Sequence, residues 1–197
     1  MELTILGSGT SVPSLTRGSA GYLVRHGRSL LLLDSGPGTL QRVLWSGATL
    51  EEITHVLYSH THVDHTADLA PLLFTSRNPS SPRRAPLTIG GSREFLEFFE
   101  EISVLYGSWI EATTYERAVI ELDGERRQMG DLAVTARRVP HIASSIALRI
   151  EDPAGRTMVY SGDTGESGDV AELAAGVDLL LIEASFPDGQ AVKGHLT

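Results

Sequence analysis

The strongest constraint on this chain is a hexapeptide at residues 60–65, His-Thr-His-Val-Asp-His, which follows the apolar run at residues 53–58 almost directly. Such a run is typical of a buried strand. If the strand continues to the second histidine, the two-residue side-chain period places the first two histidines on one face. The acid and the third histidine then lie past a turn, at the start of a helix expected over residues 66–74. The fold must therefore bring a strand end and a helix start to one cavity.

The residue types in this hexapeptide are those of a metal site. Imidazole and carboxylate are the ligands that zinc prefers, with iron and manganese as chemical neighbours. The chain has no cysteine, so any metal must be held by nitrogen and oxygen. His60 and His62 could hold one ion, and Asp64 with His65 a second. The alternative is an exposed polar strand end without metal.

Composition indicates an ordinary globular protein, with 41% hydrophobic and 21% charged residues. The 197 residues suffice for one core, so residues 1–197 are expected to form a single domain. No basic leader precedes an apolar segment, and the run at residues 30–33 is too short to cross a bilayer. We therefore expect a cytoplasmic protein without a membrane partner. The net charge of -9 argues against a broad nucleic-acid-binding face but leaves room for a small phosphate pocket.

Strand and helix patterns alternate along the whole chain. Helices are expected at residues 38–45, 49–52, 66–74 and 169–175, and between a cap at Ser92 and a stop at Gly107. Strands are expected at residues 3–6, 20–25, 29–34, 53–58, 87–89, 115–122, 132–139, 145–151, 157–161 and 178–183. A β-rich half with helices, followed by another, predicts an α+β fold of two packed sheets covered by helices.

Three further positions carry metal-ligating side chains just past an expected strand or in a loop that contains glycine. His141 follows the strand at 132–139, Asp163 follows the strand at 157–161, and His195 lies between Gly194 and Leu196. A cavity at the edge of packed sheets is built from such strand ends. Taken singly, each histidine could be a surface or core residue, and Asp163 could serve a turn.

With the hexapeptide, these positions resemble the metallo-β-lactamase superfamily and, within it, the ribonuclease Z-like branch. The matching motifs cover almost the whole chain, at residues 6–13, 33–39, 59–65, 140–141, 161–164 and 194–197. The resemblance implies an αββα sandwich of two packed mixed sheets with outer helices. The superfamily normally continues through another helix and strand, which we expect to be missing after Thr197.

The same resemblance implies a dinuclear centre, usually of zinc. His60, His62 and His141 would hold the first ion, Asp64, His65 and His195 would hold the second, and Asp163 would bridge them. Two divalent cations lower the proton affinity of a shared water, so a metal-bound hydroxide and hydrolysis are expected.

The resemblance gives two aspartates a role other than metal ligation, and each of these roles has an alternative. Asp64 is the expected catalytic residue, because in the similar enzymes it orients or deprotonates the attacking water; its other interpretation is ligation alone. Asp34 either supports the metal site from behind or caps a turn with Gly36.

The expected activity is that of a phosphodiesterase acting on a small linear or cyclic phosphodiester. Two alternatives stay open: hydrolysis of a carboxylic ester, thioester, lactone or amide, and a non-catalytic metal-binding protein. RNA and a second copy of the chain also stay open as partners. Arg77, Arg83 and Arg84 either meet a phosphate or form a solvated loop.

Maturation of transfer-RNA 3′ ends is not expected. Only 21 residues separate His141 from Asp163, which leaves no room for the protruding arm of the transfer-RNA-processing enzymes. Ile182 also stands where those enzymes carry the histidine of a His-Glu-Ala-Thr segment.

Overall fold

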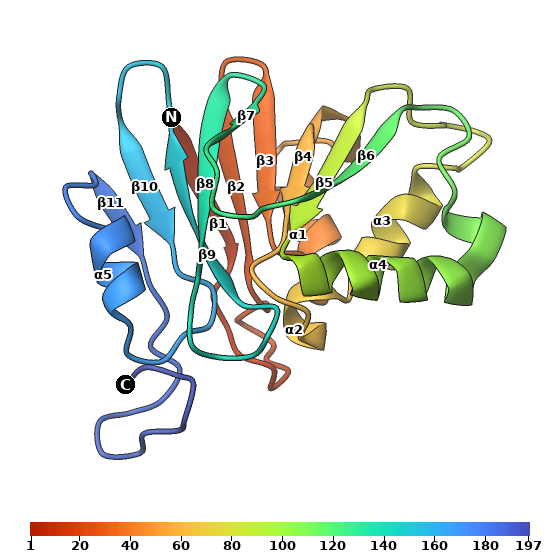
Figure 1. Cartoon of the computed structure of the whole chain (residues 1–197). Helices are drawn as coiled ribbons and strands as arrows, with labels where there is room; N and C mark the ends of the chain where they lie inside the picture. The colour runs from red at the N-terminus through yellow and green to blue at the C-terminus, as the bar shows by residue number, and fades with distance from the viewer.

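The strands form two sheets that pack face to face in a computed structural model describing residues 1–197 (Figure 1). The six strands of the first sheet lie in chain order: β1 (Glu2–Gly7), β2 (Gly21–His26), β3 (Ser29–Leu33), β4 (His55–Leu57), β5 (Leu87–Gly91) and β6 (Arg117–Glu121). The second sheet has the order β11 (Leu179–Leu181), β10 (Thr157–Tyr160), β9 (Ile146–Glu151), β8 (Leu132–Arg138) and β7 (Arg127–Met129). Both sheets mix parallel and antiparallel pairs.

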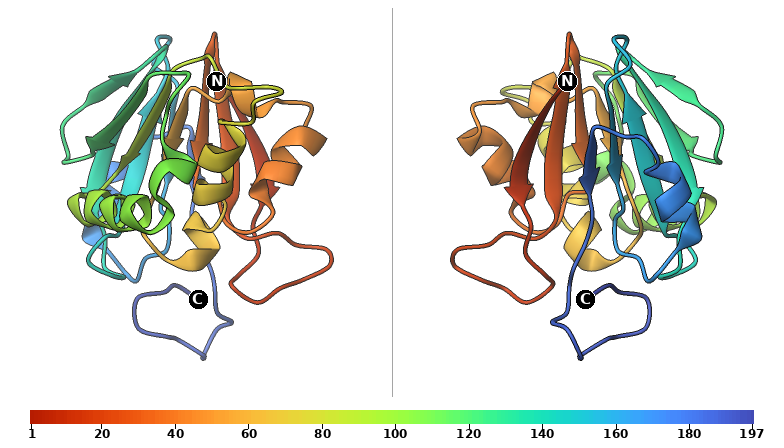
Figure 2. Two further views of the ribbon diagram at one scale, coloured as in Figure 1. Left: turned by 90° about the vertical axis from the view of Figure 1, so that its right-hand side faces the viewer. Right: turned by 90° about the vertical axis from the view of Figure 1, so that its left-hand side faces the viewer.

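Helices cover the outer side of each sheet (Figures 1 and 2). The first sheet carries α1 (Thr39–Trp45), α2 (Val63–Thr66), α3 (Leu69–Thr75) and α4 (Arg93–Tyr106), and the second carries α5 (Gly168–Leu173). Short 3-10 helices, η1 and η2, lie at Leu50–Glu52 and Gly107–Ile110. This order of layers confirms the predicted αββα sandwich. None of the helices combines the length and apolar character needed to cross a membrane.

Strand β3 shows why the sheet is buried on both faces. Its residues alternate between two cores: Leu30 and Leu32 face the helices of the first sheet, whereas Leu31 and Leu33 face the second sheet. All four leucines are at most 1% exposed. Burying each side chain contributes about 1.5–3 kcal/mol. The strand therefore anchors the sandwich just before the chain enters the site at Asp34.

Helix α4 fixes the strand that leads to the hexapeptide. The Ser92 hydroxyl accepts a hydrogen bond from the amide of Phe95, and the helix ends at Gly107, as the sequence predicts. The Phe95 ring stacks on Tyr58, with ring centroids 4.6 Å apart. Tyr58 is the last residue before the site that still pairs with the first sheet. Its amide donates a hydrogen bond to the carbonyl of Gly90 at 2.8 Å.

Two predictions about the hexapeptide's backbone were wrong. The strand does not continue to His62; it ends at Leu57, because the Ser59 amide donates to the carboxylate of Asp34 instead of to a neighbouring strand. The helix expected at residues 66–74 is two helices, α2 and α3. They separate at Asp68, whose amide donates to the carbonyl of Ser35. Strand β7 was not predicted.

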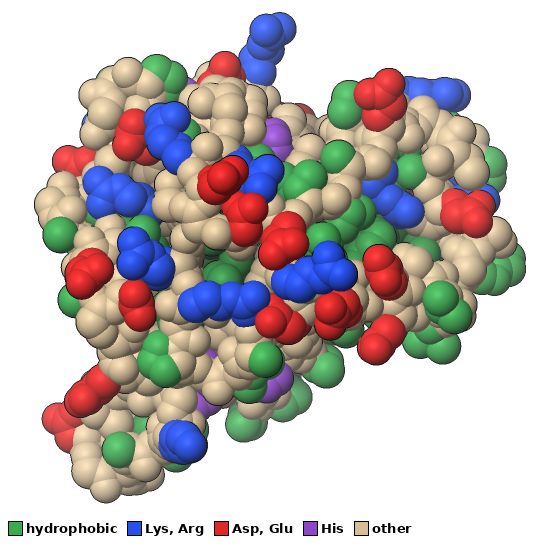
Figure 3. Space-filling model, viewed as in Figure 1, with side chains coloured by type: hydrophobic (Ala, Val, Ile, Leu, Met, Phe, Trp, Pro, Cys, Tyr) green, Lys and Arg blue, Asp and Glu red, His purple; other side chains and the backbone are tan.

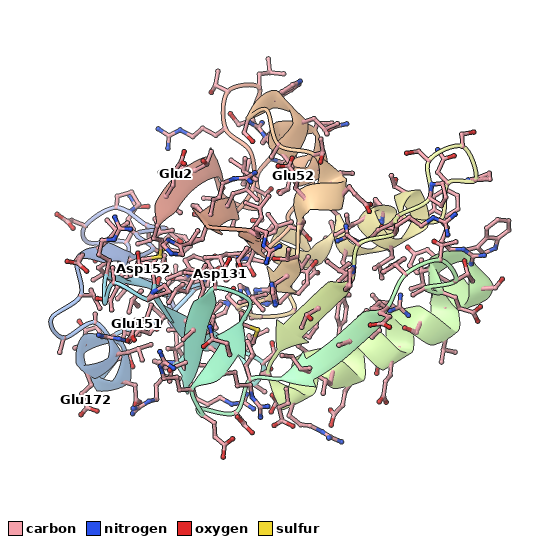
Figure 4. All side chains as sticks on the ribbon, turned by 90° about the horizontal axis from the view of Figure 1, so that it is seen from above. Glu2, Glu52, Asp131, Glu151, Asp152 and Glu172 are labelled. Carbon is pink, nitrogen blue, oxygen red and sulfur yellow. The ribbon has the colours of Figure 1, made fainter.

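The end of the sandwich seen in Figure 4 carries many of the chain's acids. Several of those labelled have basic partners: Glu52 lies 3.2 Å from Arg25, Glu151 lies 3.0 Å from Arg126, and Asp152 lies 2.8 Å from Arg156. Part of the negative charge is therefore compensated locally, away from the metal-ligand candidates.

Candidate metal centre

Asp34 is the hub on which the site is built. It is fully buried at the end of β3 and has a positive φ of 54°, which is rare for a residue with a side chain. Its Oδ2 accepts hydrogen bonds from His65 Nδ1 at 2.8 Å, from the Ser59 hydroxyl at 2.7 Å and from the Tyr160 hydroxyl at 2.5 Å. Tyr160 comes from the second sheet, so this one carboxylate joins the two sheets behind the site.

These contacts decide between the two interpretations of Asp34. The carboxylate makes no hydrogen bond with Gly36, whose amide donates to the carbonyl of Ala20. The capping interpretation is therefore wrong, and Asp34 supports His65. Gly36 has a different role, because a Cβ at this position would lie 1.9 Å from the carbonyl oxygen of Asp64. Only glycine lets the loop after β3 pass this close to α2.

His60 provides the test of whether the site fits a metal. Its ring is fully buried, and its Nδ1 lies 3.0 Å from the Ser59 hydroxyl, which itself donates to Asp34. The hydroxyl must therefore accept a hydrogen bond from a protonated Nδ1, which leaves Nε2 with a lone pair. This Nε2 is buried and has no hydrogen-bond partner in the protein. An unpartnered buried polar atom costs about 1–3 kcal/mol, which a bound cation would offset.

Three further side chains converge on this nitrogen. One ligand atom each from His60, His62, His141 and Asp163 lies within 4.8 Å of the others. His141 donates through Nδ1 to the carbonyl of Gly194 at 2.9 Å, so its Nε2 presents a lone pair, 3.0 Å from His62 Nδ1. Three imidazoles and a carboxylate at this spacing fit a divalent metal ion.

Asp163 lies between the two expected groups of ligands. Its Oδ2 is 3.9 Å from the Nε2 atoms of His60 and His141, and its Oδ1 is 3.4 Å from Nε2 of His65. The preceding Gly162 has a φ of 58° and packs so closely that a Cβ would lie 2.5 Å from Ser59 Cβ. The tight turn therefore carries Asp163 from the second sheet to the histidines of the first.

The second expected ligand group is less closely gathered. Asp64 Oδ2 lies 3.8 Å from Nε2 of His65, and His195 Nδ1 lies 3.9 Å from Oδ2 of Asp163. Asp163 thus lies near both His65 and His195, but His195 does not form a mutual cluster with Asp64 and His65. Its cluster is with Asp163 and Glu183.

Glu183 is the site residue that the sequence analysis missed. Its Oε1 accepts hydrogen bonds from His195 Nδ1 at 3.0 Å and from the amide of Thr164 at 2.9 Å. It follows the end of β11, as Asp34 follows β3 and Asp163 follows β10. That shared position was the available signal.

The electrostatics of the site favour cation binding. Burial opposes the charge on His65, but Asp34 and Asp163 outweigh it and raise its pKa to about 10. Burial, and then the charge on His65, lower the pKa of His60 to about 3. Burial would raise the pKa of Asp163, yet the hydrogen bond and charge of His65 hold it well below its usual range. A metal ion at His65 would therefore take the place of a proton that two carboxylates already stabilise.

Part of the site opens onto a cavity of about 670 Å³, and histidine side chains reach the surface at the lower edge of the molecule (Figure 3). The lining includes Asp64, His65, Asp163, Glu183 and His195, together with residues from the loop after β1 and the segment after β11.

The arginine loop is not part of this cavity. Arg77, Arg83 and Arg84 are absent from its lining. Arg83 is 2% exposed and donates to backbone carbonyls that include those of Ala85 and Leu50, both at 2.8 Å. For Arg83 both sequence interpretations were wrong: it is neither solvated nor free to meet a phosphate.

Comparisons with known proteins agree with this geometry. The family model described as a β-lactamase superfamily domain matches residues 30–197. An uncharacterized protein of Mycobacterium leprae is 35% identical over 191 residues, covering 94% of this chain and 66% of the relative, so the chain spans about two thirds of that relative's length.

Two solved structures share the fold over nearly the whole chain. The metallo-β-lactamase fold protein YhfI of Bacillus subtilis has a TM-score of 0.83 and 26% identity, covering 98% of this chain and 76% of its own. The short form of human tRNase Z has a TM-score of 0.83 and 27% identity, covering all of this chain and 85% of its own. The chain therefore belongs to the metallo-β-lactamase superfamily, in its ribonuclease Z-like branch.

Proposed function

We propose that this protein is a hydrolase with two divalent metal ions, of which zinc is the best candidate, and that it cleaves a small phosphodiester. The observation that carries the proposal is the buried, unpartnered Nε2 of His60, on which three further ligand-type side chains converge. The cavity of about 670 Å³ that opens beside this cluster offers room for a substrate, which a purely structural metal site would not need.

The proposed ligand assignment combines the cluster of His60, His62, His141 and Asp163 with the resemblance to the superfamily. His60, His62 and His141 would hold one ion and Asp64, His65 and His195 the other, with Asp163 between them. Bound there, the ions would lower the pKa of water, polarise the scissile group and neutralise the leaving oxygen.

The chain's own groups prepare and direct this chemistry. Asp64, whose carboxylate lines the cavity, would orient the attacking water and accept its proton. Asp34 keeps the His65 proton on Nδ1, and Glu183 does the same for His195, so both Nε2 atoms can act as ligands.

A small substrate suits the structure better than transfer RNA. The 21 residues between His141 and Asp163 form only a turn and the β9–β10 hairpin, with no protruding arm. Ile182 lines the cavity and puts an apolar side chain where the processing enzymes carry a histidine. The human relative is named as a tRNase, which supports phosphodiester chemistry as such.

The test compares bis-p-nitrophenyl phosphate with p-nitrophenyl acetate and a lactone on zinc-loaded protein. We expect turnover of the phosphodiester, and a fall of about 10²–10⁴-fold in kcat for Asp64→Asn. Metal content of the variant must be measured, since Asp64 is also a ligand candidate. Glu97→Gln, on the exposed side of α4, is the matched control.

Each outcome separates the three functions. Turnover of the acetate or lactone without the phosphodiester would establish the carbonyl alternative. A protein that binds zinc and turns over none of the three would support the non-catalytic alternative.

A further inference from the structure

Arg17 is the only arginine or lysine among the side chains that line the cavity. The acids of the lining, Asp64, Asp163 and Glu183, all lie close to histidines of the site. Arg17 therefore brings the one positive charge in the lining that does not depend on pH or on a bound metal.

The guanidinium of Arg17 is free to bind a ligand. The residue is exposed, no carboxylate lies within 4.0 Å of it, and its side chain makes no hydrogen bond in the protein. Most other arginines of the chain have partners: Arg83 donates to buried carbonyls, and Arg138, for example, pairs with Glu94 at 2.7 Å. An unpaired guanidinium at a cavity wall has all five of its donors available.

The backbone that carries Arg17 is held in place although the side chain is free. The loop after β1 closes on itself through a hydrogen bond of 2.7 Å from the amide of Gly9 to the carbonyl of Gly18. A Cβ at Gly9 would lie 2.9 Å from that carbonyl oxygen and 3.1 Å from Arg17 Cβ. The hydroxyl of Ser14 accepts from the Arg17 amide at 3.3 Å. The backbone of the loop therefore has a fixed position at Arg17, from which the side chain extends.

The surroundings of Arg17 also suit an anion. Ser8, Thr10 and Ser11 line the same cavity from this loop, and they contribute hydroxyl donors without charge. In Figure 2 the loop extends from the same end of the sandwich as the C-terminal segment that carries His195. A substrate at the metal cluster would therefore lie between the ligands on one side and a donor-rich wall on the other.

We infer that Arg17 is a specificity-determining residue that binds an anionic phosphate oxygen of the substrate, and thereby selects phosphodiesters over neutral esters and lactones. The inference rests on the proposed function and names the chemistry that the site selects. The planar guanidinium fork matches two phosphate oxygens, whereas a neutral carbonyl substrate offers it no charge. The cavity of about 670 Å³ has the size typical of sites for small molecules.

The experiment compares Arg17→Gln and Arg17→Lys with wild type on bis-p-nitrophenyl phosphate and on p-nitrophenyl acetate, with zinc content measured for each. Losing one charge-assisted contact should lower kcat/KM for the phosphodiester about 10–100-fold, with a smaller loss for Arg17→Lys. The rate with the neutral acetate should not change. Arg28→Gln is the control, since Arg28 is an exposed arginine in the β2–β3 turn that is absent from the cavity lining.

An equal loss with both substrates, or no loss with either, would overturn the assignment of Arg17. If wild-type protein turns over no phosphodiester, the proposed function fails separately. Equilibrium dialysis of bis-p-nitrophenyl phosphate against zinc-loaded protein then tests Arg17 by itself. Weaker binding to Arg17→Gln would support anion recognition, and equal binding would refute it.

Discussion

Asp34→Asn should weaken the fold and the metal site together. The substitution keeps the shape of the side chain but removes its charge. Oδ2 now accepts hydrogen bonds from His65, Ser59 and Tyr160, and in the variant an amide NH₂ group would face some of these donors. Breaking a buried charged network by removing one partner costs about 3–5 kcal/mol. Losing a group that orients a metal-bound histidine lowers metal affinity by about 10–100-fold. We expect losses of these sizes in unfolding free energy and in zinc affinity.

Urea unfolding of the metal-free protein, followed by tryptophan fluorescence, measures the first quantity, and competition with a chromophoric chelator measures the second. Tyr160→Phe is the matched comparison, because it removes one donor and keeps the charge; it should cost only about 0.5–1.5 kcal/mol. If Asp34→Asn unfolds at the same urea concentration as wild type and binds zinc equally well, Asp34 does not hold the site in the way its contacts indicate.

Three other substitutions test separate parts of the structure. Glu183→Gln should loosen His195 and lower the affinity for one of the two zinc ions by about tenfold, without changing the affinity for the other. Metal content after dialysis measures both affinities. Two equally tight ions in the variant would contradict this role. Arg83→Met should lower the unfolding free energy by about 3 kcal/mol, because it leaves buried carbonyls without donors, yet leave zinc affinity unchanged. An unchanged unfolding free energy would mean that solvent satisfies those carbonyls. Burial lowers the pKa of His55 from 6.5 to about 4, so the unfolded chain binds the proton more tightly and stability falls as the pH drops through this range. His55→Gln should reduce that fall in urea titrations at neutral and mildly acidic pH, and an identical pH dependence would refute the assignment.

Much of the architecture could be predicted because its signals are local. The leucines of β3, the Ser92 cap and the Gly107 stop each act within a few residues, and the structure contains them where expected. The end of β4 could not be predicted in this way. It depends on the bond from Ser59 to Asp34, which is 25 positions away and invisible to a two-residue period.

The same division applies to the site. The histidines and Asp163 were found because their residue types and motifs are distinctive, and the structure brings four of them within 4.8 Å. Glu183 and Arg17 were missed because a single glutamate or arginine is common, and only the folded chain puts them on the cavity wall. Arg83 shows the converse error, since a basic residue in a loop with several prolines can still be buried.

The hydrogen bonds of Asp34 also bear on when metal can bind while the chain is being synthesised. Its partners Ser59 and His65 belong to the first half of the chain, whereas Tyr160 and the nearby Asp163 belong to the second. A nascent chain that has emerged only as far as the hexapeptide holds histidines without the carboxylate that lies between the two ligand groups. With the proposed ligands, tight metal binding would require Asp163, and therefore a docked second sheet, so metal uptake would report completed folding.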